Sequence, residues 1–429
     1  MAKKKVLIIA YYFPPLGGAG VQRVLKFVKY LPDFGWEAVV LTVKNISYPA
    51  WDQTLLGEVP KGVEVFRTGS LDPHRILHLL RKLIIQKRGG LKSASTRISD
   101  KFGFLKCLFV PDTKIGWFPF ALWKGLSILR RHKIDVIFST SPPVTAHLVS
   151  FWLSKIGGRP SVLDFRDPSD LVAENYPTAL HRKISQSLER KVVSRAKGTV
   201  TVDRFVADDF KMKYRCEKIE TILNGFDPAD FCGLQATASG KFEIVYLGTF
   251  NRLHDPRPFL EAYSQLVAEN REFAEKASFT KVGLILDWDW PRLLQEYRLE
   301  KNVVTIGYLP HRESLQYLLK AQVLLLTTGG EKGSPLFSTG KIYEYLVSRK
   351  PILAIVPEKG AAAELLRQQK TGVIVDPRDK DRIKFELVRL FEKHQKGELG
   401  LEQTQGNLEQ FDRKCLTQKL ANFLTDCLK

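Results

Sequence analysis

The chain has 429 residues, of which 44% are hydrophobic and 26% charged, and 66 Lys and Arg against 46 Asp and Glu leave a net charge of +20. This composition excludes wholesale disorder, and 30 glycines, 22 prolines and 5 cysteines exclude a collagen-like or disulfide-stapled protein. The length predicts two or three domains, and the positive excess favours a polyanionic partner or an anionic membrane surface.

The cysteines and the apolar runs favour a cytoplasmic protein. The cysteines are odd in number and form no CxxC pair, which is typical of a reducing compartment. No stretch approaches the roughly 18 apolar residues that a membrane span needs. Residues 6–13 mimic a signal peptide, but this run is short and ends in Pro14-Pro15, so we expect a buried first strand there.

Short apolar runs alternate with helical stretches along the first half of the chain. Residues 6–10 are followed by a glycine-rich turn and an amphipathic stretch from Val21 to Leu31. Further strand-like runs lie at residues 38–43, 135–138, 161–165 and 199–202. This order of strand and helix predicts a parallel, doubly wound sheet.

The same order restarts in the second half, with strand-like runs at residues 242–247, 282–286, 303–306, 323–326, 351–356 and 373–375. We therefore expect an α/β protein with two Rossmann-like domains that face a cleft. The expected boundaries are residues 1–225, a linker at 226–240, a second domain at 241–405, and a C-terminal helix within 406–429 that packs back on the first domain. Ligands of such sheets bind beyond the carboxyl ends of the strands.

One segment is unusually basic and aromatic. Between His74 and Lys133 there are 14 Lys and Arg, 2 Asp and Glu, and 7 aromatic residues. Residues 75–88 are amphipathic, with Arg81, Lys82 and Arg88 on the polar arc and with Ile85 and Lys87 as exceptions to the pattern. This pattern fits either a helix that faces the core with a solvated basic side, or a helix on an anionic membrane surface. No recognition motif supports a nucleic-acid partner.

Two segments that follow strands carry candidate site residues. Gly17, Gly18 and Gly20 lie between the first strand and the first helix, where a glycine-rich loop is either a tight turn or a site at which backbone N–H groups meet an anion. Arg166 and Asp167 directly follow the strand at 161–165. Charged residues there line a site or form a structural pair, because unpaired burial is costly.

A third segment is the densest in candidate residues. A loop at residues 328–335 is followed by Ser338, Thr339, Gly340 and Lys341, which open a helix that carries Glu344. The helix start offers a cap, N–H groups and a cation to a phosphate, and Glu344 can accept hydrogen bonds from sugar hydroxyls. The segment is not a Walker loop, because Pro335 and Ile342 break that pattern.

Together these motifs resemble the GT-B fold glycosyltransferases of family 4, over nearly the full chain. The resemblance rests on the segments at residues 11–20, 164–168, 224–227, 248–250, 307–311, 341–346 and 350–351, in this order. It implies a nucleotide-sugar donor held mainly by the C-terminal domain and a glycan or lipid-linked acceptor held by the N-terminal one. It also implies transfer with retention at the anomeric carbon and no metal or other cofactor.

The resemblance also suggests roles for single residues. It implies that Gly17 and Gly18 approach the donor phosphates, that Glu344 binds the donor ribose, and that Arg166 stands where many relatives have an active-site histidine, with Asp167 beside it. The family often has a first glutamate eight residues before the second, where this chain has Leu336.

The chain also departs from the family at the diphosphate. The arginine and lysine that usually grip the diphosphate correspond to Thr249 and His254, so we consider Arg252, Arg257 and Lys341 as substitutes.

Other readings remain open at this point. Asp287-Trp-Asp289 resembles a metal-binding DxD motif, but a surface loop is the preferred interpretation, and the histidines show no metal-ligand spacing. A nucleotide-sugar 2-epimerase on the same fold, or a non-catalytic nucleotide-sugar-binding protein, are alternatives to a transferase. The basic segment predicts that the protein is cytoplasmic and peripheral on the inner face of a membrane, with Arg81, Lys82, Lys87 and Arg88 on the acceptor or membrane side.

Overall fold

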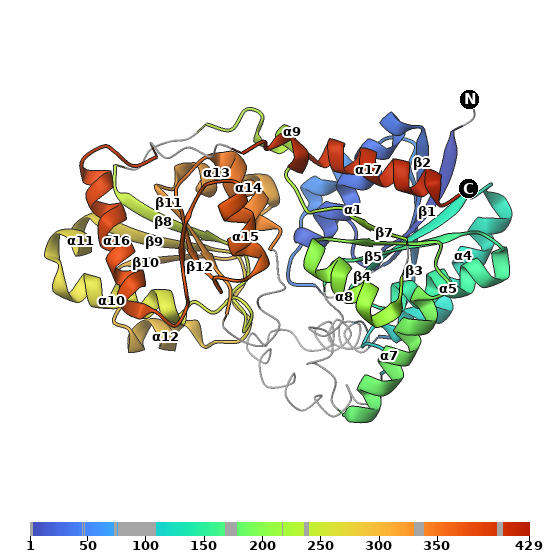
Figure 1. The fold of residues 1–429 in the computed structure, drawn as a ribbon, viewed down its shortest axis with the longest axis horizontal. Coiled ribbons are helices and arrows are strands. Elements are labelled where there is room, and N and C mark those ends of the chain that lie inside the picture. Colours follow the sequence, from blue (N-terminus) through green and yellow to red (C-terminus); the bar gives the residue numbers. More distant parts are fainter. Residues whose placement is uncertain are drawn as a thin grey trace, which may run out of the picture. The chain divides into compact units, whose positions relative to one another are not determined.

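The computed structural model describes residues 3–44, 46, 48–72, 75, 109–167, 178–216, 218–235, 240–329, 339–400 and 406–429. The chain divides into two compact units, Met1–Leu223 with Leu416–Lys429 and Asn224–Cys415. Figure 1 shows the elements of both. Each unit is built around one parallel sheet, which confirms the predicted pair of Rossmann-like, doubly wound folds.

The first unit has a seven-stranded sheet in the order β3-β2-β1-β4-β5-β6-β7, and every neighbouring pair is parallel. The strands are β1 (Lys4–Ile9), β2 (Trp36–Val43), β3 (Glu64–Thr68), β4 (Val136–Ser141), β5 (Ser161–Phe165), β6 (Gly198–Thr201) and β7 (Ile219–Thr221). The strand order reverses between β1 and β4. The crevice beyond the carboxyl ends of these two strands is the place where such sheets bind ligands.

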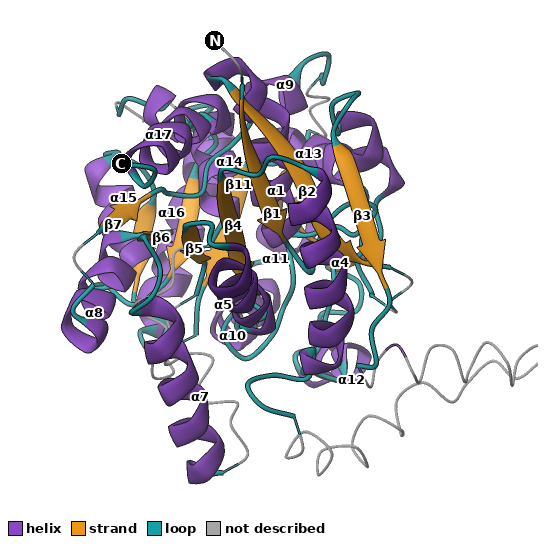
Figure 2. Cartoon of the chain, turned by 90° about the vertical axis from the view of Figure 1, so that its right-hand side faces the viewer, coloured by secondary structure: helices purple, strands orange, loops and turns teal. Residues whose placement is uncertain are grey.

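Among the described residues, the helices that accompany this sheet are α1 (Ala19–Tyr30), α4 (Phe118–Arg131), α5 (Thr145–Gly157), α7 (Ala179–Val193), α8 (Arg204–Tyr214) and α17 (Arg413–Asp426). Alternate residues of β1 face opposite sides of the sheet, as in any strand. Val6 and Ile8 pack with residues of α1 and α17, so the C-terminal helix completes the core of the first unit. Leu7 and Ile9 pack with α4 and α5, which lie on the other face (Figure 2).

The second unit has a six-stranded parallel sheet in the order β10-β9-β8-β11-β12-β13. Its strands are β8 (Phe242–Leu247), β9 (Ala277–Val282), β10 (Val303–Ile306), β11 (Val323–Thr327), β12 (Ile352–Ile355) and β13 (Val373–Val375). Its helices are α9 (Pro228–Phe231), α10 (Arg257–Glu269), α11 (Arg271–Lys276), α12 (Trp290–Glu296), α13 (His311–Lys320), α14 (Lys341–Ser348), α15 (Ala361–Gln368) and α16 (Lys380–Gln395). Here the order reverses between β8 and β11.

One predicted strand lies elsewhere in the structure, and two strands of the structure, β3 and β7, were not predicted from the sequence. The run at residues 282–286 is not a strand, because β9 covers Ala277–Val282 and Gly283 follows it with φ +118°, a conformation that ends the ladder. The edge strands β3 and β7 carry mixed polar residues and were missed. Among the described helices, none has the length and apolarity to cross a membrane.

Candidate active site

The glycine-rich loop of the first unit lies between β1 and α1, at the carboxyl edge where the strand order reverses. Gly18 has φ +97°, a conformation that L side chains rarely adopt, and its carbonyl accepts from the N–H groups of Val21 and Gln22. Gly17 donates its N–H to the carbonyl of Ala50. Gly18 is thus the N-cap of the twelve-residue helix α1, and no side chain forms a capping hydrogen bond there.

Arg166 is clamped against this loop. Its Nε donates to the carbonyl oxygen of Ser141 at 2.9 Å and its Nη2 to that of Pro142 at 2.7 Å. A Cβ placed on Gly20 would lie 1.6 Å from Nη1 of Arg166, so only glycine leaves room for the guanidinium. Burial lowers the pKa of Arg166, while the charges of Asp167 and Asp164 act in the opposite direction. Arg166 is therefore a fixed cation at the carboxyl ends of β4 and β5.

The buried arginine–aspartate pair that the sequence allowed does form, but between other residues. The guanidinium of Arg23 donates to Asp164 through Nη2 at 2.8 Å and through Nε, and both side chains are fully buried. Thr140 also donates to Asp164, at 2.7 Å. Asp164 thus has a structural role, whereas Asp167 is only half-buried, and burial raises its pKa.

In the second unit, Lys341 lies at the turn after β8. Its Nζ is 2.6 Å from the hydroxyl of Tyr246 and lies over that ring, 4.0 Å from the centroid. Gly248 has φ +126°, and a Cβ on it would come within 2.9 Å of Nζ. Burial lowers the pKa of Lys341 well below its ordinary value, and Lys281 acts in the same direction. The amine of Lys341 is thus held at the carboxyl end of β8, beside the reversal of strand order.

Lys281 is a second buried lysine, and no motif in the sequence indicated it. Its side chain is fully buried at the end of β9, and Nζ donates to the carbonyl oxygens of Gly248 at 3.0 Å and Leu284 at 2.7 Å. Burial lowers its pKa to about 7. The lysine ties together the turns after β8 and β9. The position of Lys281 within an otherwise largely apolar strand was the only sign in the sequence that this lysine is buried.

Glu344 lies in the first turn of α14, close to Lys341 in sequence. Its Oε1 is 2.8 Å from Nε2 of His311, the first residue of α13. Nδ1 of the same ring faces Asp230 of α9, with 3.6 Å to Oδ2. The Glu344 side chain keeps 21% of its surface exposed, so the carboxylate is anchored on one side and open on the other.

The other two candidate cations for the diphosphate, Arg252 and Arg257, are exposed. Arg257 forms an ion pair with Asp255 in which Nη2 is 2.6 Å from Oδ2. The Arg252 side chain is exposed, and its backbone N–H donates to Asp287 at 2.8 Å. Of the three cations considered from sequence, Lys341 is the one at the Gly248 turn.

The described start of α14 offers polar groups to a ligand. Gly340 precedes α14 without a side-chain cap. Thr339 Oγ1 is buried and has no hydrogen-bond partner among the residues that the structure describes. Five predicted site residues lie outside the described residues: Arg81, Lys82, Lys87, Arg88 and Ser338.

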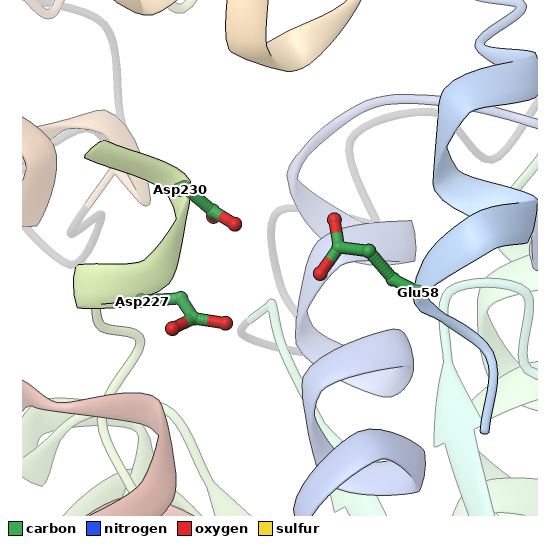
Figure 3. A group of neighbouring side chains, drawn as sticks. All are labelled: Glu58, Asp227 and Asp230. Carbon is green, nitrogen blue, oxygen red and sulfur yellow. The ribbon is translucent and has the colours of Figure 1, made fainter. Parts of the chain in front are cut away.

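The acidic residues that could suggest a metal have other partners. Asp287 binds the backbone of Arg252, as noted, and Asp289 caps α12 by accepting from the N–H of Arg292. Figure 3 shows the side chains of Asp227, which precedes α9 as its N-cap, of Asp230 on α9, and of Glu58. Within its own unit, Glu58 pairs with two lysines, Lys26 at 2.6 Å and Lys29 at 3.1 Å, and Asp227 accepts from the N–H of Ala229. We assign no metal site to these carboxylates.

Two family models match the chain. Residues 98–230 match the model described as Glycosyltransferase Family 4, and residues 241–393 match that of Glycosyl transferases group 1. No curated protein matches the chain significantly.

Solved structures share the fold over nearly the whole length of both chains. HepE of Anabaena, solved with UDP and glucose, has a TM-score of 0.66 at 17% identity and covers 99% of this chain and 100% of its own. Sucrose-phosphate synthase of Thermosynechococcus elongatus has a TM-score of 0.64 at 13% identity, with 99% of each chain covered. WaaG, a glycosyltransferase involved in lipopolysaccharide biosynthesis, has a TM-score of 0.62 at 13% identity and covers 98% of this chain and 99% of its own.

Family models thus cover about half of the first unit and most of the second, and the chain has the two-sheet architecture of these solved structures, with a lysine and an open carboxylate on one helix of the second unit. The protein belongs to the family 4, or group 1, glycosyltransferases of the GT-B fold.

Proposed function

We propose that this glycosyltransferase, which uses a nucleotide-sugar donor, moves the sugar to a glycan or lipid-linked acceptor with retention at the anomeric carbon and without a metal. The observation that carries the donor assignment is the pairing of Lys341 and Glu344 on one helix, at the edge where β8 and β11 end. A lysine and a carboxylate in one helical turn suit the two parts of a ribose diphosphate, because its phosphates are anionic and its ribose hydroxyls donate hydrogen bonds.

The diphosphate would lie against Lys341 and the start of α14. The phosphates carry the charge that develops as the bond to the sugar breaks, and a fixed ammonium and helix N–H groups stabilise that charge. Two phosphate charges favour the protonated form of a lysine whose pKa burial has lowered. In this proposal no metal is needed, because Lys341 supplies the positive charge. UDP-glucose is the first donor to test, since HepE was solved with it.

On the acceptor side, we assign Arg166 to the reacting groups rather than to the core. Its guanidinium is held by two carbonyl oxygens and the bare backbone of Gly20, so its position is fixed before any ligand binds. A preorganised cation costs no reorganisation when charge develops nearby. Asp167 is adjacent, and burial keeps its pKa raised, which suits a group that exchanges a proton with an acceptor hydroxyl.

A lipid-linked acceptor fits the exposed face of α4 and α5. Trp123 of α4 is 75% exposed and Ile156 of α5 is 56% exposed, and Phe120 and Trp152 of the same helices are exposed as well. The two helices contact each other, and they also carry the exposed cations Arg130, Arg131 and Lys155. Exposed aromatics with cations suit the interface of an anionic bilayer. We therefore place the protein on the cytoplasmic membrane face, in the synthesis of a cell-surface glycan.

This membrane proposal has a direct test. Sedimentation with anionic vesicles should pellet the wild-type chain, and Trp123→Ala should weaken the binding. Met212, which is 78% exposed on α8, provides the matched control, because Met212→Ala removes an equally exposed apolar side chain from another helix. Equal pelleting of wild type and Trp123→Ala would contradict the membrane face.

The donor assignment is tested with a panel of nucleotide sugars. A donor that binds the folded chain raises its melting temperature by mass action. The active donor is then incubated with and without membrane-lipid extracts, and the anomeric configuration of the product is read by NMR. We expect transfer that depends on the acceptor and retains the configuration. Epimerised donor in the absence of acceptor, or binding without turnover, would contradict the proposal.

A further inference from the structure

Glu344 needs a fixed orientation if it is to accept hydrogen bonds from a ribose. It lies on a helix of eight residues, and a glutamate side chain has three torsions to immobilise. The only hydrogen bond described for its carboxylate within the described residues joins Oε1 to Nε2 of His311 at 2.8 Å. An ionised carboxylate can only accept, so the hydrogen of this bond is carried by Nε2.

His311 is itself fixed from the other side. Its second ring nitrogen, Nδ1, lies 3.6 Å from Oδ2 of Asp230, an ion-pair contact that attracts when both ring nitrogens carry hydrogen, and the side chain is only 16% exposed. Asp230 projects from α9, a segment far from α13 in sequence (Figure 3). The backbone of Phe226, just before α9, is tied by hydrogen bonds to Phe411 and Arg413, which anchors this segment within the second unit. One imidazole thus joins three elements: α9, α13 and α14.

The geometry points to His311 as a positioning residue that holds the Glu344 carboxylate in the orientation that binds the donor ribose, with Asp230 setting the plane of the imidazole. This inference rests on the proposed donor site. Since Oε1 is occupied by His311, Oε2 faces the ligand, and loss of the imidazole leaves the carboxylate free to rotate. The affinity for the nucleotide then falls because the rotamer must be fixed on binding.

Two substitutions of His311 separate its contact with Glu344 from its contact with Asp230. In His311→Gln the amide nitrogen can reach the place of Nε2 and still donate to Glu344. In His311→Asn the amide nitrogen reaches only the place of Nδ1, so the contact with Asp230 is kept and that with Glu344 is lost. The variants have the same charge and chemistry, which makes each the control for the other.

The experiment is calorimetric titration of the full chain with UDP and with 2′,3′-dideoxy-UDP, which lacks both ribose hydroxyls. We expect His311→Asn to weaken UDP binding by about 3- to 10-fold, the equivalent of one ordinary hydrogen bond, and His311→Gln to weaken it by about 2-fold or less. Neither variant should change the affinity for the dideoxy nucleotide. In turnover, the donor KM should rise in His311→Asn while kcat stays nearly constant, and melting temperatures should match that of the wild type.

A set of outcomes distinguishes this inference from the donor site on which it rests. Glu344→Gln should weaken UDP binding and leave dideoxy-UDP binding unchanged. If Glu344→Gln has this effect but His311→Asn binds UDP like the wild type, the positioning role is overturned and the donor site stands. If Glu344→Gln binds UDP normally, the ribose assignment fails and the positioning role fails with it. An equal loss of both nucleotides in His311→Asn would mark a purely structural residue and overturn the inference.

Discussion

Arg23 and Arg166 lie at the same carboxyl edge of the first sheet, and we expect their replacement to have opposite consequences. Arg23 forms a fully buried pair with Asp164, in which three guanidinium–carboxylate contacts lie between 2.8 and 3.3 Å. Removing one partner leaves an uncompensated buried charge, which costs about 3–5 kcal/mol. We therefore expect Arg23→Met to lower the free energy of unfolding of the first unit by that amount.

The hydrogen-bond partners of the Arg166 side chain are neutral instead. Its side chain donates to two carbonyl oxygens, those of Ser141 and Pro142, and its surface is half-buried. Two ordinary hydrogen bonds contribute about 1–3 kcal/mol together, and water can replace part of this in a half-buried place. We expect Arg166→Gln to destabilise the unit by less than half as much as Arg23→Met, and to lower sugar transfer by at least about 100-fold, the effect of losing one preorganised donor.

Urea unfolding followed by tryptophan fluorescence measures the free energy of unfolding of the first unit, since Trp36 and Trp117 are buried in it. The effect on catalysis is measured by initial rates of sugar transfer at a temperature where both variants are folded. Arg23→Met combined with Asp164→Leu should recover most of the lost stability, because no charge is then left unpaired. If Arg166→Gln destabilises the unit as much as Arg23→Met while the folded fraction transfers sugar normally, Arg166 is structural and our assignment is wrong.

Gly20 and Lys281 each allow a substitution with a measurable consequence. Gly20→Ala should mimic the loss of Arg166, with activity lowered, because the new Cβ would displace the guanidinium, whereas Gly57→Ala, where a Cβ meets nothing within 4 Å, should leave transfer rates unchanged. The pKa of Lys281 is lowered to about 7, so between that pH and its ordinary 10.5 the unfolded chain binds more protons and the stability of the second unit should rise with pH. Lys281→Met should flatten this rise by up to about 1.4 kcal/mol per pH unit in urea titrations, and an unchanged slope would contradict a buried neutral amine.

The strand-and-helix order was predictable because central parallel strands are continuous apolar runs. The strands β8 and β13 coincide with the runs expected at residues 242–247 and 373–375. The strand β9 was misplaced because Lys281 interrupts its apolar pattern, while the apolar run that follows is broken by the left-handed Gly283. Edge strands bury less surface, so β3 and β7 gave no comparable signal.

The sequence indicated which segments carry the candidate site, but not which side chains their residues contact. The helix that carries Lys341 and Glu344 has a recognisable start, which is a local property of the sequence. The partners of these residues come from distant segments, as His311 does for Glu344. Likewise, an arginine inside an amphipathic helix gives no sign that it is buried, and the pairing of Arg23 with Asp164 depends on the packing of α1 on the sheet.

The central claim is that the second unit binds the nucleotide part of the donor through Lys341 and Glu344, and calorimetric titration of the full chain with UDP tests it most directly. Each residue would contribute a charge-assisted hydrogen bond, worth about 1.5–3 kcal/mol. We therefore predict that Lys341→Met and Glu344→Gln each weaken UDP binding by about 10- to 100-fold while the melting temperature stays near that of the wild type. Wild-type affinity for UDP in both variants would contradict the account.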